Sequence, residues 1–404
     1  MVEEKIRLGW CSDSPTYNTG FSSVSRDLIN RLNKKPFYNC KYLGHNYAGQ
    51  TLARGTKFAD GSDMDFELHP GGSKPFAQDV MSWWVKQQNL DVFGILLDTF
   101  MLFGADGWFL KQDLSPARTI MYFPSDGEAC LPLNCENILR KVDMPVAMSK
   151  FAQKQAWKVH GIKTEYIPHA VNRKLFYPLE AEEKLRLKAQ WGLQDRFVVG
   201  TVARNQPRKM LDRTFKAFKV FAEGKDDVVL FMHSDPNDIS MVFDARNLIT
   251  RYGLQNKVLF SGVRYFRGFP YDKMNEVYNL MDVHLLTTSG EGFGVPTIEA
   301  SACGVPSVAT DFTTTKELLV DNGECGLPAK CLGSDLDTVT GNWNVERSIM
   351  DIHDCAKQLE KLYKDNALHK RLSAVGIKKV AKYYDWEQVA DDWDKLIRDK
   401  VMQL

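Results

Sequence analysis

The chain has 404 residues, of which 44% are hydrophobic and 25% are charged, the composition of a soluble globular protein. Its 52 basic and 51 acidic residues leave a net charge of +1, so no overall field favours nucleic acid or anionic lipid as a partner. A chain of 404 residues is too long for one ordinary core, and it predicts two domains of about 150–200 residues each.

The amino-terminal residues are charged and lack the apolar core of a signal peptide. No window approaches the ~18 consecutive apolar residues that span a membrane. We therefore expect a cytoplasmic protein without a membrane span. The eight cysteines include no C-x-x-C pair, which favours reduced structural thiols over a disulfide framework or a metal site.

Short apolar runs alternate with amphipathic helical stretches along the whole chain, which predicts an α/β architecture with parallel sheets. The strands expected in the first half are residues 7–10, 92–97, 119–123 and 145–148. Those expected in the second half are residues 197–202, 228–232, 258–260 and 306–309.

Three further segments bear on the organisation of the chain. Residues 44–77 are rich in Gly, Ser and Asp, so we expect long loops that could include a hairpin and form an acceptor surface. Residues 167–178 contain two prolines and no helical period, which indicates an interdomain linker. The tail from residue 383 onward carries an apolar stripe with helical spacing, and such a stripe needs a partner face.

The most informative stretch is residues 289–299, which places Glu291 and Glu299 eight positions apart around a Gly-Phe-Gly turn. The run at 283–288 reads as a buried strand, and Pro296 stands where a first helical turn accepts proline. Glu291 should therefore lie on a strand-to-helix loop and Glu299 on the helix. Backbone N–H groups of the turn and the helix N-terminus could hold a phosphate, while ionised carboxylates suit sugar hydroxyls. This pattern indicates the donor loop of a nucleotide-sugar glycosyltransferase.

A second candidate segment, residues 204–209, follows the strand expected at 197–202 and precedes a helix expected at about 211–223. A cation at the carboxyl end of a parallel strand points into the crevice where open α/β sheets bind ligands. Arg204 can grip a phosphate bidentately, and Lys209 can add a point charge. The alternative is a solvated basic loop that caps a helix; the glutamate loop favours the phosphate hypothesis.

These segments resemble the retaining GT-B glycosyltransferases of the large sucrose-synthase-like family 4, also called glycosyl transferases group 1. Residues 202–212 resemble the family's G-R-x-x-x-x-K-G-x-D stretch, and residues 291–299 match its Glu, seven residues, Glu motif. Residues 302–309, 317–327 and 167–172 resemble its A-x-G-x-P-V-V-A, E-L-V-x-D-G-x-x-G-L and I-P-N-G-V-D runs. Trp386 and Trp393 lie in a stretch similar to the family's last helix, which crosses back onto the first domain. The matches extend over about residues 145–397.

The resemblance implies an α/β GT-B fold, in which two Rossmann-like domains face a cleft. Its boundaries would be residues 1–168 for an N-terminal acceptor domain, 169–380 for a C-terminal donor domain, and 381–404 for a helix packing back on the first. It also implies that Arg204 and Lys209 neutralise the donor diphosphate, and that Glu291 binds sugar hydroxyls. Glu299 would bind the ribose. The backbone of Gly292, Phe293 and Gly294 would contact the phosphate and the sugar.

Two places in the first half depart from the family pattern. The family has a Gly-Gly loop after the first strand, whereas this chain offers only Gly20, which could still let its backbone approach the donor phosphate. Where the family often has a histidine, the corresponding residues 122–128 of this chain read Tyr-Phe-Pro-Ser-Asp-Gly-Glu. Asp126 could stand in for it near the sugar, and an Asp-Gly turn is the alternative.

No metal site is expected. The D-x-D pairs at 63–65 and 335–337 formally match the metal motif of another glycosyltransferase fold, but both are expected in loops outside a suitable strand. His169 and His284 have no His or carboxylate partner at metal-like spacing, and His233 could line the donor cleft.

The sequence thus predicts a metal-independent retaining glycosyltransferase that uses a UDP- or GDP-linked sugar as co-substrate, with no other cofactor. The acceptor could be a glycan, a lipid, a metabolite, a protein or a modified nucleic acid, and the oligomeric state is open. A GT-B-fold epimerase or phosphorylase is one alternative. A non-catalytic nucleotide- or sugar-binding module is the other.

Overall fold

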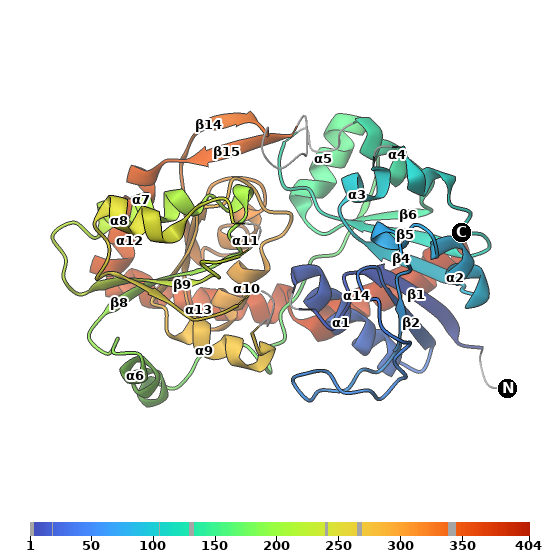
Figure 1. The fold of residues 1–404 in the computed structure, drawn as a ribbon, viewed down its shortest axis with the longest axis horizontal. Coiled ribbons are helices and arrows are strands. Elements are labelled where there is room, and N and C mark those ends of the chain that lie inside the picture. Colours follow the sequence, from blue (N-terminus) through green and yellow to red (C-terminus); the bar gives the residue numbers. More distant parts are fainter. Residues whose placement is uncertain are drawn as a thin grey trace. The chain divides into compact units, whose positions relative to one another are not determined.

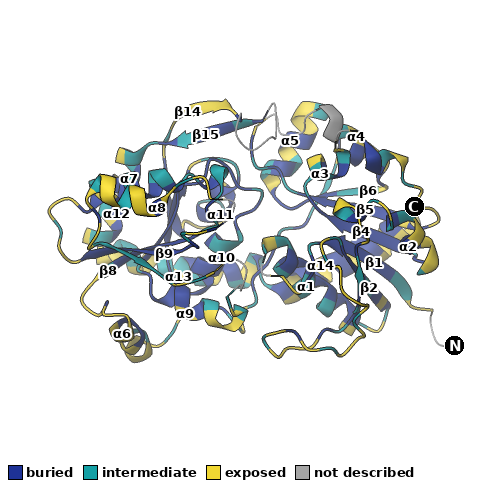
Figure 2. Ribbon diagram, in the orientation of Figure 1, coloured by how far each residue is buried: buried dark blue, intermediate teal, exposed yellow. Residues whose placement is uncertain are grey.

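The computed structural model describes residues 4–17, 19–104, 106–128, 133–238, 241–264, 269–337 and 345–404 (Figure 1). Within these ranges the chain forms two compact units. The first unit holds residues up to 125, 129–169 and 386–404, and the second unit holds residues 126–128 and 170–385. Each unit has one parallel sheet, and Figure 2 shows buried strands beneath helices with exposed outer faces.

The first unit is built on a seven-stranded sheet of order β3-β2-β1-β4-β5-β6-β7. Every adjacent pair is parallel. The strands are β1 (Ile6–Ser12), β2 (Tyr38–Gly44), β3 (Glu67–Pro70), β4 (Val92–Leu96), β5 (Arg118–Phe123), β6 (Met144–Ala147) and β7 (Glu165–Tyr166). The helices are α1 (Gly20–Lys34), α2 (Met81–Gln87), α3 (Thr99–Phe103), α4 (Leu133–Lys141), α5 (Lys150–His160) and α14 (Trp386–Asp399).

Helix α14 buries its apolar face in the first unit. The six residues of the predicted stripe are all buried: Trp386, Val389, Ala390, Trp393, Leu396 and Ile397. The Trp393 ring packs edge-on against Trp10 of β1 and Tyr122 of β5, with ring centroids 5.6 and 4.9 Å away. Because aromatic rings bury large areas and favour such edge-to-face contacts, Trp393 anchors the last helix on this sheet.

The second unit is built on a six-stranded parallel sheet of order β10-β9-β8-β11-β12-β13. Its strands are β8 (Phe197–Val202), β9 (Val228–His233), β10 (Val258–Phe260), β11 (Val283–Leu286), β12 (Ser307–Thr310) and β13 (Gly326–Ala329). Its helices are α6 (Ala181–Gln190), α7 (Leu211–Phe221), α8 (Ala245–Tyr252), α9 (Met274–Asn279), α10 (Val295–Ala302), α11 (Thr315–Leu319), α12 (Ile352–Lys364) and α13 (Asn366–Tyr383). A separate antiparallel ribbon joins β14 (Cys331–Leu336) to β15 (Glu346–Met350), drawn in orange in Figure 1.

All nine strands predicted from apolar runs, including the one at 283–288, are present, and their ends match the prediction or differ by at most two residues. The prediction of long loops at residues 44–77 was partly wrong, since β3 joins the sheet. Isolated antiparallel bridges link Leu52 to Leu68 and Lys57 to Asp63, in agreement with the hairpin that the prediction allowed. The sequence also missed β2, in which buried and more exposed residues alternate only at its start. The apolar-run criterion finds fully buried strands better than strands such as β2, which mix buried residues with more exposed ones.

The predicted loop around the second D-x-D pair was wrong as well. Asp335 and Leu336 belong to β14, and Asp337 follows directly. The strand escaped prediction because residues 332–336 are exposed, so they carry no buried run. Among the cysteines whose side chains are described, all are free thiols and most are buried. Cys130 lies outside the described residues.

Trp393→Ala should destabilise the first unit by about 3–5 kcal/mol, because it removes a fully buried ring and leaves a cavity. Urea unfolding of the full chain measures this change. The matched control is Trp83→Ala on α2, whose side chain is 60% exposed and which should change stability little. Equal effects of the two substitutions would show that α14 is not anchored through Trp393.

Candidate functional site

The candidate site lies where the strand order of the second sheet reverses. The chain runs outward from β8 through β9 to β10 and then returns to β11, on the other side of β8. Open parallel sheets bind ligands outside the carboxyl ends of the strands that flank such a reversal. The segments predicted from sequence, residues 204–209 and 289–299, follow β8 and β11. The fold therefore brings the two candidate segments to one edge of one sheet.

The loop after β8 ends in a tight turn that places Lys209. A 3-10 turn spans Pro207–Lys209, with Pro207 in its first turn, where a missing N–H costs nothing. Met210 then adopts a left-handed conformation with φ 47° and begins α7. Lys209 is only 8% exposed, so this turn directs a lysine into the unit rather than toward solvent.

Hydroxyl side chains join this loop to the one after β11. The Ser289 amide donates to the Arg208 carbonyl at 2.7 Å, and the Thr288 hydroxyl donates to the same carbonyl at 3.2 Å. The Thr287 hydroxyl donates to the Lys209 carbonyl, also at 3.2 Å. These bonds satisfy buried backbone groups, which would otherwise be costly, and they hold the two loops in register.

Glu291 is buried between two cations. Its Oε1 lies 2.5 Å from Nζ of Lys209, and its Oε2 lies 2.9 Å from a guanidinium nitrogen of Arg208. The side chains of Lys209 and Glu291 are 9% and 7% exposed. A carboxylate can be buried as an ion only when cations or hydrogen bonds compensate its desolvation, and here both of its oxygens are compensated.

The pKa shifts agree with an ionised cluster at neutral pH. Burial alone would raise the pKa of Glu291, but the charges of Arg208 and Lys209 outweigh burial and lower the pKa to about 2. Burial and the neighbouring charge of Arg208 lower the pKa of Lys209 to about 8, against the opposing effect of Glu291. Near pH 7 the site therefore holds a carboxylate and a protonated lysine.

The Gly-Phe-Gly turn is held by the loop after β12. The Glu291 amide donates to Oγ1 of Thr313 at 3.0 Å, and the Thr314 hydroxyl donates to the Phe293 carbonyl at 2.6 Å. Gly294 has φ 104°, a conformation that glycine adopts without strain, and it caps α10. Pro296 lies in the first turn of α10, as predicted. The turn therefore presents Gly292 to Gly294 at a helix N-terminus.

Glu299 lies on α10 and is also buried. It accepts a hydrogen bond from the Tyr278 hydroxyl, at 2.6 Å from its Oε2. Burial and the nearby charge of Glu299 raise the pKa of Tyr278 well above its ordinary value, so the phenol remains a donor. Sequence reasoning missed Tyr278, which lies on α9 and carries no motif signal.

Arg204 pairs with an aspartate of the loop after β9. Its Nε and one terminal nitrogen lie 2.7 and 3.1 Å from the two carboxylate oxygens of Asp238, which is 1% exposed. This bidentate pair fixes the guanidinium plane beside the carboxyl ends of β8 and β9. The sequence did not single out Asp238, because nothing in its spacing from Arg204 signals the contact.

The remaining predicted residues, Gly20 and Asp126, belong to different units. Gly20 begins α1 in the first unit, directly after Thr19, whose side chain caps the helix. Asp126 belongs to the second unit, with Oδ2 lying 3.9 Å from Nε of Arg208 and 3.0 Å from Arg347. Asp126 therefore lies with the other candidate residues of the second unit, whereas Gly20 follows β1 in the first unit.

Two site arginines were not assigned from sequence. Arg208 stands beside Lys209 in the recognised segment, so a signal for it was present. Arg347 lies on β15, far along the chain from either motif, and only the fold brings it to Asp126.

Within the described ranges, no group of three His, Cys, Asp or Glu side chains could hold a metal ion. His233 and His284 are buried, and burial lowers their pKa values to about 4 and about 3, so both are neutral at pH 7. No helix in the described part of the chain is long and apolar enough to cross a membrane.

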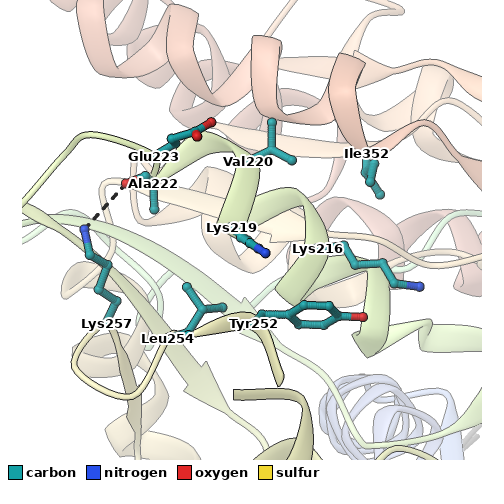
Figure 3. Close-up of a pocket in the computed structure, with 10 residues that line it drawn as sticks. Lys216, Lys219, Val220, Ala222, Glu223, Tyr252, Leu254, Lys257 and Ile352 are labelled. Atoms are coloured by element: carbon teal, nitrogen blue, oxygen red, sulfur yellow. Dashed lines mark hydrogen bonds between the residues drawn. The ribbon is translucent and has the colours of Figure 1, made fainter. Parts of the chain in front are cut away.

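A hollow of about 380 Å³ lies elsewhere on the second unit, between α7, α8 and the start of α12 (Figure 3). It shares no residue with the candidate site. Two of its three lysines serve the fold, because Lys257 donates to the carbonyl of Ala222 and Lys216 pairs with Asp212. We therefore assign no ligand to this hollow.

Because Glu291 is buried as an ion, the free energy of unfolding should depend on pH in a specific way. Its folded pKa of about 2 lies below the ordinary value of 4.5, so its ion pairs contribute stability that is complete above pH 4.5 and is lost as the pH falls toward 2. The stability difference between wild type and Glu291→Gln should therefore shrink below pH 4.5, by on the order of 3 kcal/mol in total. Urea unfolding at pH 7, 5 and 3 measures it. A difference independent of pH would contradict an ionised Glu291.

Known proteins resemble this chain in sequence and in fold. Residues 183–379 match the glycosyl transferases group 1 family. Mannosylfructose-phosphate synthase of Agrobacterium fabrum is 22% identical over 274 residues, which cover 66% of this chain and 55% of that protein. This chain spans about half the length of the curated relatives it matches.

Solved structures share the fold over nearly the whole chain. A sucrose-phosphate synthase from Thermosynechococcus elongatus has a TM-score of 0.77 at 18% identity, covering 98% of this chain and 99% of that one. The Anabaena protein HepE, solved in complex with UDP-glucose, has a TM-score of 0.71 at 16% identity, covering 98% and 100%. Over residues 183–379, which carry the Lys209–Glu291 pair, this chain is similar to the glycosyl transferases group 1 family, and it has the GT-B fold.

Proposed function

We propose that this chain is a retaining glycosyltransferase that moves a sugar from a nucleoside-diphosphate sugar to an acceptor hydroxyl. The observation that carries the proposal is the buried Glu291 held between Arg208 and Lys209, beside a glycine turn at the N-terminus of α10. A diphosphate needs fixed cations and amide donors, and a sugar needs carboxylate acceptors. One edge of one sheet supplies both.

The cations would act on the leaving group. When the bond between the anomeric carbon and the phosphate oxygen breaks, its electron pair stays on the nucleoside diphosphate, which gains negative charge. Lys209, Arg208 and Arg204 would stabilise this charge from fixed positions, without reorganisation during the reaction. The acceptor oxygen attacks from the same face, and its proton passes to the leaving phosphate oxygen. No side-chain nucleophile is required.

The two glutamates would orient the donor. Each Glu291 oxygen already accepts from one cation, and a carboxylate has about four acceptor sites, so lone pairs remain for sugar hydroxyls. Glu299 uses Oε2 to accept from Tyr278, and we assign it to the ribose hydroxyls. Asp126 lies beside Arg208, and we assign its carboxylate to the phosphate and sugar side of the site.

We propose one class of donor and several classes of acceptor. The HepE complex favours a uridine nucleotide, and we propose UDP- or GDP-linked hexose as the donor, bound without a metal ion. The acceptor belongs to the glycan, lipid, metabolite, protein or modified nucleic acid classes, because acceptor choice depends on loops that differ between family members.

Lys209→Ala should weaken nucleoside-diphosphate binding about 10- to 100-fold, because it removes a charged donor worth about 1.5–3 kcal/mol. Isothermal titration of the purified chain with UDP, GDP and their hexose conjugates, without added metal, measures the dissociation constants. The matched control is Lys216→Ala on α7, a lysine paired with Asp212 at the surface, which should bind like wild type.

Each result of the titration has a defined meaning. Selective binding by wild type, weakened only by the Lys209 substitution, supports the donor site and names the nucleotide. If no nucleotide binds to wild type, or if both lysine substitutions weaken binding equally, the phosphate assignment is wrong.

A further inference from the structure

Residues 126–128 are fastened to β15 of the second unit. The Glu128 amide donates to the Glu346 carbonyl at 3.1 Å, and the Glu346 amide donates back at 3.0 Å. A Cβ atom on Gly127 would lie 2.5 Å from the Glu346 carbonyl oxygen, so only glycine fits there. The segment is therefore held by main-chain bonds at a fixed position.

The same segment lies against the loop that carries Glu291. A Cβ atom on Gly290 would come within 1.9 Å of the Asp126 carbonyl oxygen. Ser348, the residue two positions after Glu346, donates its amide to the Ser289 carbonyl at 3.0 Å. Strand β15 thus contacts both residues 126–128 and the donor loop.

Arg347 joins these contacts with three donors. Its two terminal nitrogens donate to the carbonyl of Asp126 at 2.9 Å and to its Oδ2 at 3.0 Å. Its Nε donates to Oδ2 of Asp337 at 2.5 Å. The Arg347 side chain is only 8% exposed, so this planar fork is fixed by its partners rather than by solvent.

The contacts form a row of alternating charges that ends in the candidate site. Arg347 contacts Asp126, Asp126 lies 3.9 Å from Nε of Arg208, and Arg208 pairs with Glu291 at 2.9 Å. Asp126 therefore faces a cation on each side. Its carboxylate attracts the same guanidinium that pairs with Glu291.

We propose that Arg347 is a positioning residue of the donor site. By fixing the carboxylate of Asp126, it sets the orientation of the Arg208 guanidinium beside Glu291, and so the affinity of the site for a diphosphate. This inference rests on the proposed function for the identity of its ligand. The coupling between Arg347 and Arg208 does not depend on that function. A lysine at position 347 keeps the charge but cannot reproduce three donors in one plane.

A double-substitution cycle on the full chain tests the proposal. Arg347→Lys should raise the dissociation constant for UDP or GDP about tenfold in the wild-type background, and less than about twofold in the Arg208→Gln background. The urea midpoint of the full chain should show the same pattern without ligand. The control Arg371→Lys alters an exposed ion pair with Glu324 and should have additive effects in both backgrounds.

The two readouts separate the possible failures. If wild type binds neither nucleotide, the proposed function fails, and the urea midpoints still decide whether Arg347 is coupled to Arg208. If binding occurs and Arg347→Lys has the same effect in both backgrounds, the positioning role is overturned while the proposed function stands. If Arg347→Lys does not fold, Asp126→Asn removes the same link at constant size, and equal effects in both backgrounds would again overturn the proposal.

Discussion

A buried carboxylate with a cation on each oxygen is the interaction on which the second unit depends. Burying the Glu291 carboxylate would cost a prohibitive desolvation free energy if its charge were unpaired. Lys209 and Arg208 compensate this free energy only in the geometry that the two loops impose. That geometry requires β8 and β11 to be neighbours, and it requires the hydroxyls after β11 to bind the carbonyls after β8. Fold and site are therefore stabilised by the same contacts.

The site is charged before any ligand arrives, and this has a chemical consequence. Cations already fixed by protein contacts need little reorganisation to meet a departing diphosphate, which is the condition for effective electrostatic stabilisation. The backbone accepts local cost for this arrangement, since Met210 and Thr313 both have positive φ values of 47° and 51°. Both residues lie next to the groups that position Lys209 and Glu291.

The first unit is completed by the end of the chain rather than by its first half alone. Helix α14 buries six apolar residues there, and Tyr38 of β2 donates to its buried Asp394 at 2.8 Å. The region that matches the family, residues 183–379, covers most of the second unit and none of the first. The stretch that matches the family and the Lys209–Glu291 pair thus lie together in the second unit.

Local patterns by themselves determined the parallel α/β architecture, the central strands, the proline-started helix α10 and the loop positions of Lys209 and Glu291. These follow from apolar runs and turn residues, which act over a few neighbours in the chain. The tertiary structure alone decided that Lys209 faces Glu291, that Arg204 pairs with Asp238 and that Arg347 holds Asp126. Such contacts depend on strand order and on the pairing of β15 with the exposed strand β14, because charge pairs between distant segments leave no pattern in the sequence.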